Sequence, residues 1–177
     1  MSKWAECSAS PNPGGRAFPT AAAPQSLSTL DADANGNLEI VVGFHATSNL
    51  VSLPDGTDDL HSYAMALDAN GRRLWCADLA GYSTTVHPLV ASRPGKPPLL
   101  YAWVDGSNLE KRGTAFYYDP TVLVFDLELR ERAAHTVGGQ SKDPAWRLCV
   151  ADLDRDGRQE ILWLDTSLRV LRLRGWW

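Results

Sequence analysis

Two stretches of the chain share one pattern of polar and apolar positions. Each has an acidic loop, a glycine, a glutamate and then a run of apolar residues, and they span residues 30–44 and 151–165. Their first aspartates, Asp31 and Asp152, lie 121 residues apart, which is about twice 60. A fixed period of this size is typical of repeat architectures. The pattern therefore predicts a repeating unit of about 60 residues.

A degraded third copy is expected midway between the two. Residues 86–104 fit that place once the loop is shortened by two residues. The apolar anchors Ile40, Leu99 and Ile161 are then spaced by 59 and 62 residues. The middle loop, residues 92–96, has no carboxylate and carries two cations, so we expect it to bind no metal.

Each unit also carries a later pair of apolar runs. Residues 62–79 form two such runs around Asn70 and Gly71, which is a strong hairpin signal. Residues 121–137 occupy the same place in the second unit, and residues 168–175 begin it in the third. Four antiparallel strands in each unit of this length are typical of a β-propeller blade.

The expected fold class is therefore all-β, a partial β-propeller of about three four-stranded antiparallel blades with the third incomplete. The blades are assigned to residues 26–80, 86–138 and 146–177. They follow a flexible leader over residues 1–25, which is rich in Pro, Ser, Ala and Gly. A helix over residues 58–69 is the alternative, because apolar side chains there have helical spacing. The aligned run in the second unit is strand-like, which favours a strand.

Composition narrows the function classes of this chain of 177 residues. Its 17 Lys and Arg against 21 Asp and Glu give a net charge of −4, so we expect no nucleic-acid partner. No apolar run approaches the roughly 20 residues that span a bilayer, and the first 15 residues lack the apolar core of a signal peptide. The cysteines, Cys7, Cys76 and Cys149, do not make a disulfide framework or a zinc site by number and spacing.

The two acidic loops place oxygen ligands at alternating positions. The candidate metal ligands are Asp31, Asp33, Asn35, Asn37 and Glu39 in the first loop and Asp152, Asp154, Asp156, Arg158 and Glu160 in the second, with a backbone carbonyl from the seventh position. Hard oxygen ligands in this number suit Ca²⁺ better than Mg²⁺, which retains more of its own water. An EF-hand is excluded because its bidentate Glu belongs at the twelfth position, where Val42 and Trp163 stand.

An ordinary turn is the other interpretation of such a loop, since Asp, Asn and Gly cluster in turns without any metal. Two loops in phase favour metal binding. The sequence therefore predicts two Ca²⁺ sites as the only cofactors, and the second site is expected to be the tighter because it has four carboxylates against three.

The loop pattern followed by an apolar strand resembles the FG-GAP/VCBS repeat family. Its members are calcium-loop blades of seven-bladed propellers, as in integrin alpha chains, fungal lectins and some rhamnogalacturonan lyases. The resemblance covers residues 27–79 and 146–177 by motif and residues 86–137 by period alone. The Phe-Gly and Gly-Ala-Pro signatures of the family are absent. Residues 66–75 are similar to the tryptophan-docking motif of quinoprotein-like propellers, which implies that Trp75 wedges between blades.

No catalytic motif is present, and the four histidines are scattered singly, so no catalytic residue is assigned. Trp75 and Trp163 lie in apolar strands and are interpreted as core residues. Trp103 ends a strand beside Asp105 and is the one candidate for ligand binding.

Two function classes stay open at this stage. The first is a calcium-binding, non-catalytic propeller segment that binds a carbohydrate or a protein; the second is a fragment of a rhamnogalacturonan-lyase-type polysaccharide lyase, as the resemblance implies. Members of the family are typically secreted, yet no signal peptide is found, so the compartment stays open. Three blades leave bare sheet faces, expected to carry Leu38, Ile40 and Trp163, so a homodimer or a larger propeller is expected.

Overall fold

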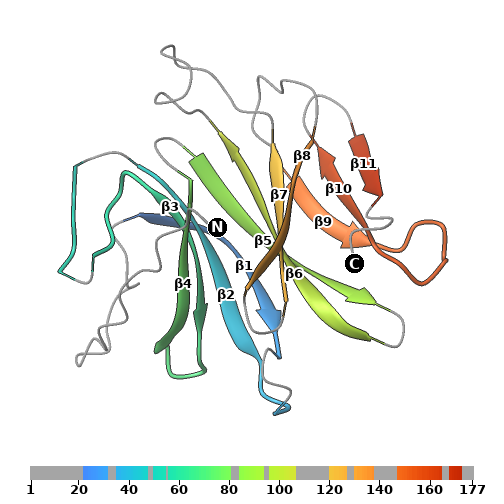
Figure 1. Ribbon diagram of the computed structural model, residues 1–177, viewed down its shortest axis with the longest axis horizontal. Coiled ribbons are helices and arrows are strands. Elements are labelled where there is room, and N and C mark those ends of the chain that lie inside the picture. Colours follow the sequence, from blue (N-terminus) through green and yellow to red (C-terminus); the bar gives the residue numbers. More distant parts are fainter. Residues whose placement is uncertain are drawn as a thin grey trace.

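The computed structural model describes residues 22–31, 35–47, 50–54, 56–80, 84–93, 96–106, 120–126, 130–137, 147–164 and 168–172, and within them every regular element is a β-strand (Figure 1). The strands are β1 (Ala23–Leu30), β2 (Glu39–His45), β3 (Ser62–Leu67), β4 (Arg73–Ala80), β5 (Thr84–Arg93), β6 (Lys96–Gly106), β7 (Thr121–Phe125), β8 (Glu131–Thr136), β9 (Arg147–Ala151), β10 (Glu160–Leu164) and β11 (Leu168–Arg172). The all-β prediction is confirmed.

The strands pair in three antiparallel meanders. The first meander is β1-β2-β3-β4, the second is β5-β6-β7-β8, and the third is β9-β10-β11. One residue pair, His45 with Thr85, joins β2 to β5, so the first two meanders form one curled sheet of eight strands. The third meander is a separate three-stranded sheet. Figure 1 shows the first meander at the left and the third at the right.

Two apolar layers lie between the meanders. The first contains side chains of both the first and the second meander, among them Val41, Ala66 and Leu100. The second contains side chains of the second and third meanders, among them Tyr101, Val124 and Ile161. The second meander is therefore buried on both faces, and its inner strands β6 and β7 are apolar at nearly every position because each face meets another sheet.

The first two meanders approach each other closely at β2 and β5. A Cβ atom on Gly43 would lie 2.0 Å from the carbonyl oxygen of Val86, so only glycine fits there. On β1, Ser26 and Ser28 donate hydrogen bonds from their hydroxyls to the carbonyl oxygens of Val86 and Pro88. These contacts give the β5 edge partners that a neighbouring strand would otherwise supply.

The same turn joins the last two strands of the first and second meanders. In the β3–β4 turn, Asp68 accepts hydrogen bonds from the Arg72 amide and from the Arg72 side chain. In the β7–β8 turn, Asp126 accepts the same two bonds from Arg130, and a further one from Arg132. The hairpin predicted over residues 62–79 is confirmed, with Gly71 in the left-handed region at φ 77°.

Several sequence expectations need correction or fall outside the described residues. Residues 62–67 are strand and not helix. β1 begins at Ala23, inside the range assigned to the leader, and residues 1–21 lie outside the described part. Cys76 is disulfide-bonded, which the scattered cysteines did not predict, whereas Cys149 is free and exposed.

Candidate metal centre

The two acidic loops occupy equivalent places in the fold. The first joins β1 to β2 and is closed by the pair Leu30–Glu39. The second joins β9 to β10 and is closed by the pair Ala151–Glu160. Each loop thus connects the first two strands of its meander, and the middle loop, between β5 and β6, is closed by Arg93 and Lys96.

The hydrogen bonds inside the two loops also match. The amide of Gly36 donates to Asp31 Oδ2 at 3.0 Å, and the amide of Gly157 donates to Asp152 Oδ2 at 2.9 Å. One residue later, the amide of Asn37 donates to Asn35 Oδ1 at 2.7 Å, and that of Arg158 donates to Asp156 Oδ1 at 2.9 Å. The first carboxylate therefore holds the turn in both loops.

The reversal of the chain uses left-handed backbone in both loops. Gly36 has φ 85° and Gly157 has φ 83°, values that a glycine adopts without steric cost. In the second loop Arg155 also has a positive φ of 59°, which is uncommon for a residue with a side chain. Arg155 lies in the sequence between Asp154 and Asp156, two of the aspartates that form the cluster described next.

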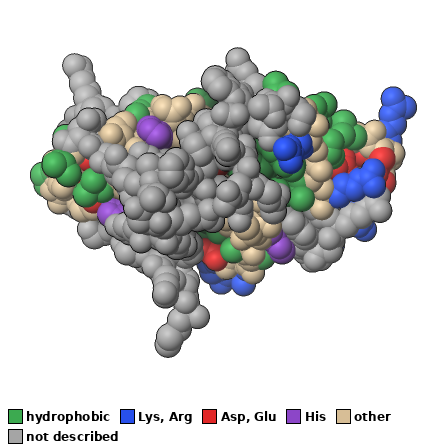
Figure 2. Space-filling model, turned by 90° about the horizontal axis from the view of Figure 1, so that it is seen from above, with side chains coloured by type: hydrophobic (Ala, Val, Ile, Leu, Met, Phe, Trp, Pro, Cys, Tyr) green, Lys and Arg blue, Asp and Glu red, His purple; other side chains and the backbone are tan. Residues whose placement is uncertain are grey.

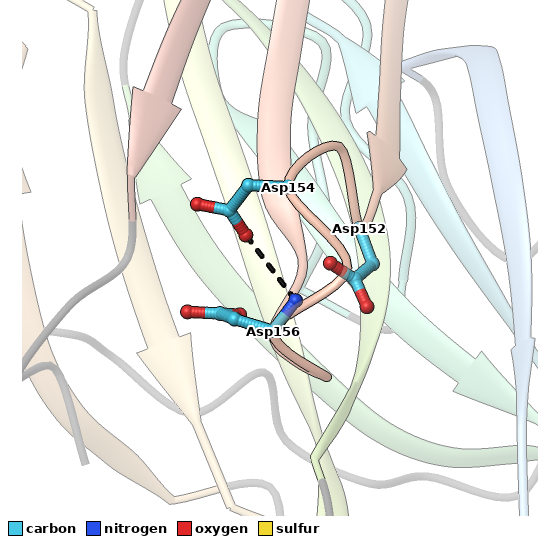
Figure 3. Close-up of side chains that lie close together, drawn as sticks. All are labelled: Asp152, Asp154 and Asp156. Atoms are coloured by element: carbon cyan, nitrogen blue, oxygen red, sulfur yellow. Dashed lines mark hydrogen bonds between the residues drawn. The ribbon is translucent and has the colours of Figure 1, made fainter.

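Three carboxylates of the second loop converge. Asp152, Asp154 and Asp156 each offer one oxygen, and these oxygens lie within 4.8 Å of one another (Figure 3). Asp152 Oδ1 is buried and has no hydrogen-bond partner among the described residues. A buried carboxylate oxygen without a donor is costly, so the site fits a cation that would supply the missing interaction.

Glu160 has a different position from the three aspartates. It is 3% exposed, and its Oε2 accepts a hydrogen bond from the amide of Leu153 at 3.0 Å. Glu160 is not a member of the close cluster, so the structure gives this residue the role of fixing the loop. Arg172 of β11 reaches Asp154 with 3.7 Å between Nη2 and Oδ2, and it partly balances the charge of the cluster. In Figure 2 acidic and basic side chains lie together at this end of the molecule.

The first loop is described only in part. Asp33 lies outside the described residues, as do Ala32 and Ala34. Asp31 Oδ1 accepts a hydrogen bond from the amide of Asn35 at 3.0 Å, whereas its counterpart Asp152 Oδ1 has none. Glu39 is buried like Glu160. Within this loop the described ligand candidates are therefore Asp31, Asn35, Asn37 and Glu39.

Trp103 is not a surface residue. It is 0% exposed, its ring packs against that of Trp163 with centroids 5.2 Å apart, and its Nε1 donates to Asp105 Oδ2 at 3.0 Å. Because Trp103 sits between the second and third meanders, its assignment as a ligand-binding residue was wrong. The core assignment of Trp163 is confirmed, and Trp75 packs edge-on against Phe125 of the second meander.

A second polar cluster, which the sequence analysis does not predict, lies beside β3 and β4. Asp58 Oδ1 accepts hydrogen bonds from the amides of Leu60 and His61 and from the hydroxyl of Tyr63. Burial raises the pKa of Tyr63, and burial also raises the pKa of the neighbouring Asp78 to about 6, against the lowering effect of His61. These residues come from a loop and two strands, so no local motif marks them.

Comparisons with family models, with curated proteins and with solved structures find no match for this chain. Among the described residues, none of the elements is a helix long and apolar enough to cross a membrane.

Proposed function

We propose that the chain is a calcium-binding, non-catalytic segment of a β-propeller of the FG-GAP/VCBS type, which binds a carbohydrate or protein ligand. The single observation that carries the proposal is the equivalence of the two acidic loops. Each loop joins the first two strands of its meander. In each loop, the amide of the sixth residue donates a hydrogen bond to the carboxylate of the first residue, and the amide of the seventh residue donates to the side chain of the fifth.

The arrangement of the meanders supports the propeller part of the proposal. A blade is a four-stranded antiparallel meander, and adjacent blades pack face to face. The first two meanders have four strands, the third has three described strands, and apolar layers lie between successive meanders. Trp75 of the first meander against Phe125 of the second is the kind of contact that a docking tryptophan would make.

The donor set of the second loop supports calcium. Ca²⁺ takes six to eight oxygen ligands at roughly 2.3–2.6 Å. The three clustered aspartates, the carbonyl of Arg158 and water would fill such a shell, while Glu160 holds the loop. Three acidic groups near one point repel one another, and a divalent cation would remove that repulsion.

Calcium titration by isothermal calorimetry tests the proposal. We expect two Ca²⁺ per chain, with the second loop the tighter, and a higher melting temperature in Ca²⁺ than in EDTA because the ion binds only the folded state. At a Ca²⁺ concentration of 100 times Kd the stabilisation would be about 2.7 kcal/mol.

Two controls sharpen the titration. Asp154→Asn should weaken the tighter site and leave the weaker one unchanged, and Mg²⁺ at the same concentration should stabilise less. Zero or three sites, or equal melting temperatures in Ca²⁺ and EDTA, would contradict the proposal.

A further inference from the structure

The outer face of the first meander carries a third apolar cluster. Val41 and Ala66 point into the layer against the second meander. Their strand neighbours Val42 and Met65, which pair with each other, therefore point to the opposite face. The other buried members of the cluster on this face are Ala22, Phe44, Tyr63, Leu67 and Cys76. The outer face is thus apolar across β2, β3 and β4.

The side chains of this face are buried without help from the other two meanders. Phe44 and Met65 are 0% exposed and Val42 is 4% exposed. Every described member of the cluster comes from the first meander or from Ala22, directly before it. The outer face of the third meander is the contrast, since Leu168 there is 66% exposed. Another part of the chain is therefore needed to cover the first meander.

The described chain points to residues 1–21 as that cover. The loop before β3 meets the face at one end, where Asp58 accepts a hydrogen bond from the hydroxyl of Tyr63. The centre of the face, around Met65, lies two positions farther along β3. Ala22, the first described residue, is 3% exposed and belongs to the cluster, so the residues before it start from this face.

A disulfide ties the same face to a distant part of the sequence. Cys76 lies on this face, pairs with Met65 across β3 and β4, and is disulfide-bonded. The chain has three cysteines, and Cys149 is free. Cys7 is therefore the one remaining partner for Cys76.

A segment that joins Cys7 to Ala22 has to cross the sheet. Ala22 precedes β1, whereas Cys76 lies in β4, at the other end of the order β1-β2-β3-β4. Three strand spacings amount to roughly 14 Å. Cys7 precedes Ala22 by 15 residues, and an extended chain of that length spans up to about 50 Å. The segment is long enough to pass over β2 and β3.

The composition of residues 8–21 suits a covering segment better than a fifth strand. Pro11, Pro13 and Pro19 lack the amide that a sheet ladder needs. Proline also restricts the free chain, which lowers the entropy cost of holding it in one place. Phe18 supplies a large apolar side chain that can pack on the face.

We propose that residues 7–21 lie across the outer face of the first meander, held by a Cys7–Cys76 disulfide, and close this face to other chains. This strap goes beyond the proposed function and does not depend on bound calcium. It caps one end of the row of meanders, as terminal repeats cap a solenoid, and leaves the third meander exposed at the other. Because disulfides persist in oxidising compartments, the strap is closed there and opens where thiols are kept reduced.

Reduction opens the strap by thiol–disulfide exchange. A dithiol such as dithiothreitol attacks one sulfur of the bond, forms a mixed disulfide and then closes its own cyclic disulfide. Two electrons pass from the reagent to the S–S bond. Cys7 and Cys76 each take one proton and become thiols.

Peptide mapping by mass spectrometry tests the linkage. Without reduction we expect a peptide pair that joins Cys7 to Cys76 and separates in dithiothreitol, while Cys149 is alkylated directly. Alkylation of Cys76 before reduction, or a bond from Cys76 to Cys149 or to a second copy, would overturn the proposal.

The oxidation of Met65 tests whether the strap covers the face. Met65 is 0% exposed, and methionine oxidation follows exposure. Cys7→Ser breaks the disulfide without changing a residue of the described sheet. Hydrogen peroxide should therefore oxidise Met65 at least about tenfold faster in this variant than in the parent. Cys149→Ser, which removes a free thiol and keeps the disulfide, is the matched control and should leave the rate unchanged. Equal rates in the two variants would overturn the proposal.

Assembly gives a second measurement that needs no change at Cys7. The Cys149→Ser protein contains only Cys7 and Cys76, so dithiothreitol opens a single bond in it. With its outer face bare, the first meander of one copy can pack against the exposed face of the third meander of another, a head-to-tail contact that repeats. Light scattering should show larger species with dithiothreitol than without it. Equal masses would contradict the closing of this face by the strap, whether or not the chain binds Ca²⁺.

Discussion

At Gly43, the close approach of the first two meanders depends on the lack of a side chain. A Cβ there would overlap the carbonyl oxygen of Val86, and backbone cannot move aside as a flexible side chain can. We expect Gly43→Ala to lower the free energy of unfolding by about 3 kcal/mol, in the range of overpacked cores. The opposite change at an exposed strand position, Ala134→Gly, should cost only about 0.5–1 kcal/mol. Chemical denaturation measures the free energy of unfolding of both variants, and equal effects would show that the first two meanders can move apart at this point.

Asp78 makes stability depend on pH. Burial raises its pKa to about 6 in the folded state, above the ordinary value of 3.8, with Asp58 adding to the rise and His61 opposing it. The folded state therefore binds this proton more tightly, and the resulting stability is full below pH 3.8 and is lost as pH rises through about 6.

Asp78→Asn should remove this dependence. We expect the variant to be more stable than the parent at pH 8 by about 1 kcal/mol, less than the whole shift because the carboxylate is partly exposed, and nearly equal at pH 4. Thermal melts between pH 4 and 8 measure the difference. A parallel decline of both proteins with pH would assign the dependence to other groups.

The local sequence does not determine the environment of every single residue. Trp103 and Trp163 lie in strands that read as continuous apolar runs, and such runs do not tell which face meets another sheet. The sequence favours a core position for Trp163, whereas the Asp-Gly after its strand makes Trp103 a candidate for ligand binding. The Asp105 of that dipeptide is itself buried as the hydrogen-bond acceptor of Trp103, a tertiary relation that no local pattern carries.

At the scale of elements, local patterns predict a strand or turn best where the interacting residues are close in the sequence. The hairpin turn at Asp68 is closed by Arg72, four residues on, and its copy at Asp126 is closed by Arg130. The 58-residue spacing between the two aspartates therefore reflects one repeated turn. By contrast, one pocket is lined by β1, β5 and β9, which are distant in sequence, so residue spacing could not predict it.

The two acidic loops should respond differently to the loss of their first aspartate. In Ca²⁺, Asp152→Ala should lower the melting temperature more than Asp31→Ala, because the second loop has more carboxylates for the ion. In EDTA the order should reverse. Asp31 accepts amide hydrogen bonds from Asn35 and Gly36, whereas Asp152 accepts one from Gly157 and has a buried oxygen with no hydrogen-bond partner in the described part of the chain.

Thermal melts of both variants in Ca²⁺ and in EDTA give the four melting temperatures that this comparison needs. Asn at the same positions, Asp31→Asn and Asp152→Asn, serves as the matched control because it keeps one acceptor oxygen. If Asp31→Ala lowers the melting temperature more in both buffers, hydrogen bonds within the loop, and not the metal, decide the effect.

On the scale of the whole molecule, the outer face of the third meander is largely apolar and exposed over its described residues. Register places Ala151, Cys149, Leu162, Leu164, Leu168 and Val170 on this face, together with Glu160 and Arg172 beside the acidic loop. Leu168 is 66% exposed and Val170 is 45% exposed. The expectation that Ile40 and Trp163 would be bare was wrong, since both pack into apolar clusters, whereas Leu38 is exposed as expected.

We expect this exposed apolar face to make copies of the chain associate in solution. The same kind of face is buried between the first and second meanders and between the second and third, and exposed apolar patches commonly mark interaction sites. β11 also pairs only with β10 among the described strands, so its other edge is open to another chain. We expect the purified chain to form a dimer or higher species, with two-fold pairing the commonest solution.

Light scattering coupled to size-exclusion chromatography measures the mass of the species that the chain forms in solution. Val170→Lys, in the middle of β11 on the bare face, should shift the chain toward the monomer of 19.4 kDa because burying an ammonium in an apolar interface is costly. Ala134→Lys, on exposed β8, should not. If the parent chain is itself a monomer with one cooperative melt, three meanders are a stable unit alone. The exposed apolar face would then need no second copy of the chain, contrary to the expectation from an unclosed set of blades.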